Sequence, residues 1–88
     1  MTREACAEEL YNYICDHASN FNAPYGVLMG NNTNKTGKKY VEITFGRTRT
    51  LAATAAVYGP KFIHFRTSTG RNELVRSLDA AKEFVDRL

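Results

Sequence analysis

The sequence predicts an α+β fold in which two helices flank an antiparallel sheet. Apolar residues recur at helical spacing near both ends of the chain, and period-two alternation fills the region between them. We therefore expect an N-terminal helix, a meander of four to five antiparallel strands and a C-terminal helix. Both helices should cover one face of the sheet, which gives a two-layer sandwich with one thin core. At 88 residues the chain is predicted to be a single domain over residues 1–88.

The first helix is predicted over residues 3–19. Thr2 is a candidate N-cap, and glutamates follow it where the helix dipole favours negative charge. Pro24 disfavours helical backbone before it and so ends the helix. Cys6 and Cys15 lie nine residues apart on opposite helix faces and cannot pair, so we expect one to be buried and one partly exposed. The predicted buried face is Cys6, Leu10, Tyr13, Ile14, His17 and Phe21.

The five candidate strands lie between residues 25 and 76. A short apolar run at 25–29 precedes a polar, basic loop at 30–39, and the clearest alternation follows at 40–45. Residues 51–58 are compatible with either a helix or a strand. Their alanines favour a helix, whereas the turn residues around them favour a strand, which is our prediction. Alternation returns at 61–67, and residues 72–76 would be the hairpin partner of that strand.

The last helix is predicted to begin after Ser77, a candidate N-cap. Its buried stripe would be Leu78, Ala81, Val85 and Leu88, with help from Phe84. With both helices on one face of the sheet, the inward residues would be Val41, Ile43, Phe45, Leu51, Ala53, Val57, Ile63 and Phe65. The outward residues would be Tyr40, Glu42, Thr44, Thr54, Tyr58, Phe62, His64 and Arg66.

This outward face is the main candidate interaction surface. Mixed aromatic and polar faces occur on antiparallel sheets that simply meet water, where cross-strand aromatic pairs stabilise the sheet. Exposed aromatics also mark protein interfaces, and aromatics interleaved with cations stack nucleic-acid bases. We predict partner binding by the loop at residues 31–39 together with Tyr40, Tyr58, Phe62, His64 and Arg66.

Basic residues gather in the predicted loops. They would contact phosphates or an acidic partner, although a net charge of +3 is modest for a dedicated nucleic-acid-binding protein. The candidates are Lys35, Lys38, Lys39, Arg47 and Arg49.

Catalytic and metal-binding motifs are not recognisable. Six residues separate Gly30 from Gly37, and Lys39 stands where a phosphate loop needs a hydroxyl. The cysteines and histidines do not have the spacing of a zinc site. We therefore expect no enzyme activity, no catalytic residues, no metal and no cofactor.

The start of the chain lacks the features of a secretory signal, and two reduced cysteines fit a reducing compartment, so a cytoplasmic location is expected. No apolar run is long enough to span a membrane. The leading hypothesis is a non-enzymatic protein-binding inhibitor or modulator. By its size and style it resembles phage-encoded proteins that act on host defence or nucleic-acid-handling complexes. The alternative is a small basic nucleic-acid-binding protein, and a third possibility is a homodimer formed through the outward faces.

Overall fold

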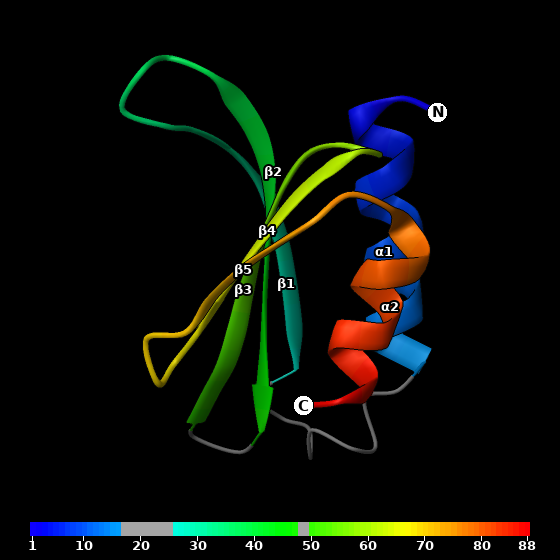
Figure 1. The fold of residues 1–88 in the computed structure, drawn as a ribbon, viewed down its shortest axis with the longest axis vertical. Coiled ribbons are helices and arrows are strands. Elements are labelled where there is room, and N and C mark those ends of the chain that lie inside the picture. Colours follow the sequence, from blue (N-terminus) through cyan, green and yellow to red (C-terminus); the bar gives the residue numbers. More distant parts are fainter. Residues whose placement is uncertain (17–25, 48–49) are drawn as a thin grey trace.

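The computed structural model describes residues 1–16, 26–47 and 50–88, without the side chains of Arg47, Thr50 and Leu51. It confirms the α+β fold: helix α1 (Arg3–Asp16), five antiparallel strands in the order β1-β2-β3-β4-β5, and helix α2 (Leu78–Asp86). Figure 1 shows both helices on the same side of the sheet. The strands are β1 (Val27–Thr33), β2 (Lys39–Arg47), β3 (Thr50–Gly59), β4 (Phe62–Thr67) and β5 (Asn72–Val75).

Helix α1 begins as predicted at Thr2. The Thr2 hydroxyl accepts a hydrogen bond from the Ala5 amide at 3.0 Å, and its carbonyl accepts one from the Cys6 amide at 2.9 Å. The buried side chains are Cys6, Ala7, Leu10 and Ile14, and Cys15 is partly exposed. The predicted end of the helix at residue 19, His17 and Phe21 lie outside the described residues. Within the described ranges, neither helix has the length and apolarity needed to cross a membrane.

The core rests on the pairing register of β2, β3 and β4. Ile43 pairs with Ala55, which pairs with Phe65, and all three side chains are fully buried beneath the helices. The segment that was ambiguous in the sequence is therefore a strand, and its alanines lie between larger residues on both sides. All predicted inward residues whose side chains the structure describes are buried. The side chain of Leu51 is not among those described.

Helix α2 begins at the predicted N-cap, where the Ser77 hydroxyl accepts a hydrogen bond from the Ala80 amide at 3.0 Å. Phe84 stacks on Phe65 with ring centroids 4.2 Å apart and an angle of 22° between the planes. The expectation that Leu88 would be buried is wrong. The helix ends at Asp86, so Leu88 lies beyond the last helical turn and is 36% exposed.

Strand β1 is longer than the sequence analysis predicted, and the loop at residues 30–39 is shorter. Residues Gly30, Asn31, Asn32 and Thr33 pair with β2, which leaves only residues 34–38 as the connection. Antiparallel pairing satisfies the backbone groups of these polar residues, while their side chains remain in water at the sheet edge. Loop-like composition therefore did not mark the end of the strand.

Replacing Phe65 with alanine should lower the free energy of unfolding by about 3–5 kcal/mol, because it leaves a cavity beside Phe84. Phe62→Ala is the matched control from the same strand, since Phe62 is 41% exposed, and it should cost about 1 kcal/mol. Urea denaturation followed by circular dichroism measures both values. Equal losses for the two variants would show that the stacked pair is not central to the core.

Candidate functional site

The outer face of the sheet is the side opposite the helices, and no described element lies over it (Figure 1). The strand register arranges its side chains in rows that cross the sheet. One row runs through Leu28, Thr44, Thr54, Arg66 and Asn72, and the next through Gly30, Glu42, Ala56, His64 and Leu74. The central strand β3 contributes only the small side chains of Thr54 and Ala56 to these rows, and the larger side chains come from the other strands.

An aromatic cluster, defined as Tyr40, Tyr58 and Phe62, occupies the end of the outer face next to the β1–β2 hairpin. The Tyr58 ring lies 5.0 Å from the Tyr40 ring and 5.0 Å from the Phe62 ring, measured between centroids. The Lys38 ammonium lies 5.4 Å from the Tyr58 centroid and 5.3 Å from that of Phe62. This arrangement combines exposed ring surface with a cation–π contact.

Asn34 organises the hairpin that carries Lys38. Its side-chain oxygen accepts hydrogen bonds from the Thr36 amide at 3.0 Å, the Thr36 hydroxyl at 2.8 Å and the Lys38 amide at 2.9 Å. Gly37 follows with φ of 86°, a conformation that disfavours other residues. The Asn34 side-chain nitrogen donates to the Tyr58 hydroxyl at 3.3 Å, so the loop is tied to the aromatic cluster.

An open hollow of 320 Å³ lies beside the cluster, lined by Asn34, Lys38, Tyr58, Phe62, His64 and Leu74. Phe62 and Leu74 are each 41% exposed, which gives this hollow an apolar wall on the outer face. Asn34 lies in the loop that was predicted to contact the partner, whereas Leu74 was not predicted as a site residue. For Leu74 the signal was present, because period-two alternation with Val75 directed inward places Leu74 outward.

The predicted partner-binding residues do not all lie together. Tyr40, Tyr58 and Phe62 are in contact, and His64 lines the adjoining hollow. Arg66 belongs to a different row, where it pairs with Thr54 and Asn72, further from the cluster. The five residues thus divide into a compact group of four and one outlying cation.

The predicted basic residues are also divided. Lys35 and Lys38 lie on the hairpin beside the cluster, whereas Lys39 is in register with the inward residues of β2. Arg47 lies at the other end of β2, about 26 Å away at the rise of an extended strand. Arg49 lies outside the described residues. A single phosphate or acidic group of a partner therefore cannot contact both the hairpin lysines and Arg47.

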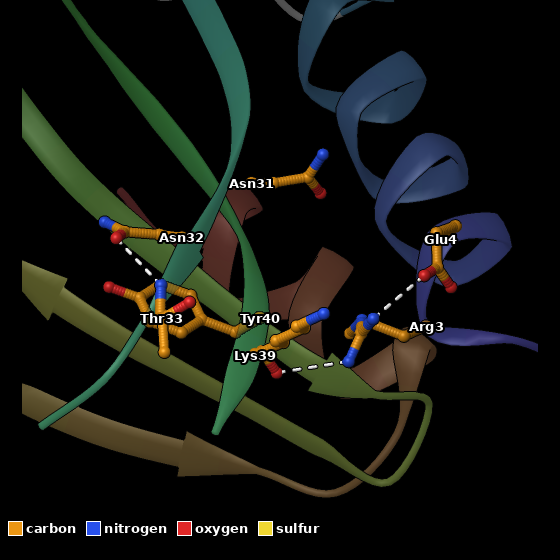
Figure 2. A pocket seen from close by; sticks show the side chains of 7 residues that line it. All are labelled: Arg3, Glu4, Asn31, Asn32, Thr33, Lys39 and Tyr40. Carbon is orange, nitrogen blue, oxygen red and sulfur yellow. Dashed lines mark hydrogen bonds and ion pairs between the residues drawn. The ribbon is translucent and has the colours of Figure 1, made fainter. Parts of the chain in front are cut away.

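A second hollow of 370 Å³ lies between the start of α1 and the paired ends of β1 and β2 (Figure 2). Arg3 donates hydrogen bonds to the Lys39 carbonyl at 3.2 Å and to the Glu4 carboxylate at 3.0 Å. A backbone hydrogen bond and the neighbouring guanidinium hold the pKa of Glu4 below its usual value. Arg3 and Glu4 are therefore paired with each other, and Lys39 is the further cation in the lining. This hollow lacks the exposed aromatic ring of the first one and is the weaker candidate site.

Tyr40 connects the aromatic cluster to the only carboxylate of the outer face in the described part of the chain. Its hydroxyl donates to Glu42 Oε2 at 3.5 Å, and the Asn32 amide donates to the same oxygen at 3.4 Å. Burial, and secondarily the negative charge of Glu42, raise the pKa of Tyr40 above its usual value. The phenol is therefore held in its neutral, hydrogen-bond-donating form.

The described residues contain no close group of three histidine, cysteine or acidic side chains that suits a metal ion. Ala56 stands between Glu42 and His64 in their row, so these two do not form an acid–base pair. The chain matches no known family model, and no curated protein or solved structure proved similar to it. The outer face of the sheet, with its aromatic cluster and open hollow, is therefore the candidate interaction surface.

Replacing Glu42 with glutamine should bring the pKa of Tyr40 part of the way back toward its ordinary value, because the charge contribution disappears while the burial contribution remains. Since folding raises this pKa, the stability that it contributes is complete below about pH 10 and is lost as the pH rises through the folded value. Ultraviolet titration of the phenols measures the pKa, with Tyr40→Phe to assign the signal. An unchanged or higher pKa in Glu42→Gln would contradict the assignment.

Proposed function

We propose that the protein is a non-enzymatic binding protein that holds a protein partner on the outer face and acts as an inhibitor or modulator of that partner. The observation that carries this proposal is the aromatic cluster with Lys38, which lies beside the exposed Leu74 on a face that no described element covers. Tyrosine and phenylalanine are enriched at the centres of protein interfaces, whereas lysine is depleted there, so the rings rather than Lys38 support a protein partner.

The shape of the outer face supports the same proposal. Small side chains at Gly30, Ala56 and Thr54 let another surface approach the sheet closely, and the hollow beside Phe62 can receive an apolar side chain of the partner. Phe62 and Leu74 would be removed from water on binding, which supplies the hydrophobic driving force. Occupying a functional surface of the partner is the means by which such a protein would inhibit.

The proposal predicts that the double variant Tyr58→Ala/Phe62→Ala binds its partner at least about tenfold more weakly, because it removes the centre of the contact. The partner is first recovered from nuclease-treated lysate of the native source, and affinities are then measured with purified components by calorimetry. Circular dichroism establishes that the variant is folded.

The matched control is Lys82→Ala, which removes a cation 5.3 Å from the Tyr13 ring on the helical side of the protein. This variant should keep its affinity for the partner. A weaker affinity for Lys82→Ala, together with an unchanged affinity for the double variant, would move the binding surface to the helices.

Nucleic-acid binding is the second candidate function, and the position of three lysines favours it. Lys35 and Lys38 lie in the β1–β2 hairpin, and Lys61 lies in the β3–β4 turn directly before Phe62. In the meander these two connections are at the same end of the sheet as the aromatic cluster. Cations around stackable rings are the arrangement that single-stranded nucleic acids use.

If this second function holds, affinity for a fluorescent single-stranded oligonucleotide should fall with salt. The logarithmic slope should be about −2 for three phosphate contacts, and Lys35→Gln should make it shallower by about 0.7. Lys82→Gln, on the helical side, should leave the slope unchanged. Fluorescence anisotropy at several salt concentrations gives the slopes. A salt-independent affinity would contradict phosphate binding.

A further inference from the structure

Among the residues that the structure describes, strand β1 is an edge of the sheet that pairs with β2 on one side only. It has seven residues and no charged side chain, and most of it is exposed. The other edge, β5, has four residues, and its Glu73 is bridged to Arg71 at 3.0 Å and to Arg87 at 3.4 Å. Short length and charge protect an edge from pairing with another chain. By these criteria β5 is protected and β1 is not.

The backbone groups available on this edge follow from the register. The Gly46 amide donates to the Gly26 carbonyl at 3.4 Å, and the Asn34 amide donates to the Lys38 carbonyl at 2.9 Å. Hydrogen-bonded pairs alternate along antiparallel strands, so the even-numbered residues of β1 bond to β2 and the odd-numbered ones direct their amide and carbonyl groups outward.

Three residues of β1 therefore offer both groups: Val27, Met29 and Asn31. The fourth odd-numbered residue, Thr33, does not, because its amide already donates to the Asn32 side-chain oxygen at 2.8 Å (Figure 2). This capping bond limits pairing at the hairpin end of the strand.

We propose that β1 pairs antiparallel with β1 of a second copy of this chain, about a twofold axis at Met29. In this register Met29 pairs with Met29 of the second copy, and Val27 pairs with Asn31 in both directions. All three available amides and carbonyls of each copy are then used. The two five-stranded sheets join into one continuous sheet, and the helices of both copies stay on the same side of it.

The side chains fit this register. Leu28, which is 68% exposed, comes opposite Gly30 of the second copy in a pair without hydrogen bonds, where side chains approach most closely. A β-carbon built on Gly30 would meet nothing within 4 Å, and a hollow of 260 Å³ surrounds this position. Each Leu28 thus enters the hollow over the other copy's glycine. The hollow is lined by residues 28–32 together with Glu42 and Thr44.

The charge of the strand does not oppose a second copy at this edge. Each copy has a net charge of +3, but β1 itself carries no charge, so the two strands meet without like charges opposite one another. Met29, 44% exposed on the helical side of the strand, meets its own counterpart at the axis. Pairing therefore buries two exposed apolar side chains from each copy.

Sedimentation equilibrium of the purified chain from about 10 μM to about 1 mM tests the proposal, because this range covers weak dimers. The mass should rise from 9.9 kDa toward twice that value. Met29→Lys places two ammonium groups at the axis and should weaken the dimer at least about tenfold. The control Leu74→Lys introduces the same charge on the protected edge at similar exposure and should dimerise normally.

Gly30→Val is the second test variant. Valine favours strands and its side chain meets open space at this position, so the monomer should stay folded. The valine side chain would fill the hollow that Leu28 of the second copy is proposed to enter. Gly30→Val should weaken the dimer. In the unmodified chain, dimerisation at higher concentration should protect the amides of Val27, Met29 and Asn31 from hydrogen exchange, and the variant should lose this protection.

A mass of 9.9 kDa throughout the concentration range overturns the proposal. A dimer that neither Met29→Lys nor Gly30→Val affects also overturns it. If the natural partner of the β1 edge is a strand of a different protein, the purified chain keeps a mass of 9.9 kDa throughout the range. None of these readouts involves the partner of the outer face, so they are independent of the proposed function.

Discussion

The pairing register of β2, β3 and β4 is the constraint on which the other features of the structure depend. Side chains alternate between faces, so a shift of one residue would turn Ile43 and Phe65 into water and Tyr58 into the core. The buried row Ile43, Ala55 and Phe65 makes that shift very unfavourable. The residues that specify the core thereby also specify which side chains reach the outer face.

The small side chains of β3 affect both faces of the sheet. Ala53 and Ala55 are fully buried, and their small volume lets α1 approach the middle of the sheet while Phe45 and Phe65 fill the space on either side. On the opposite face Thr54 and Ala56 leave the centre low, so the rings of Tyr58 and Phe62 stand out at one end. A single strand with an alanine-rich sequence therefore shapes both the core and the candidate site.

Local patterns predicted most of this fold, and contacts between distant residues account for what they missed. Thr2 and Ser77 were identifiable as caps, and alternation gave the inward and outward residues of β2 and β4. Composition misplaced the end of β1, because pairing with β2 decides whether Asn31 and Asn32 are extended. The ties from Asn34 to Tyr58 and from Lys38 to Phe62 depend on tertiary packing, which no spacing in the sequence encodes.

The hydrogen bonds of Asn34 also determine the entropy of any contact made by the hairpin. A loop that is ordered only on binding loses about 1–2 kcal/mol of backbone conformational entropy for each residue that it fixes. Here one asparagine oxygen holds the amides of Thr36 and Lys38, and its side-chain nitrogen reaches Tyr58, all within the folded monomer. That entropy is lost during folding, so a partner meets Lys38 already in position and the association keeps more of its interaction energy as affinity.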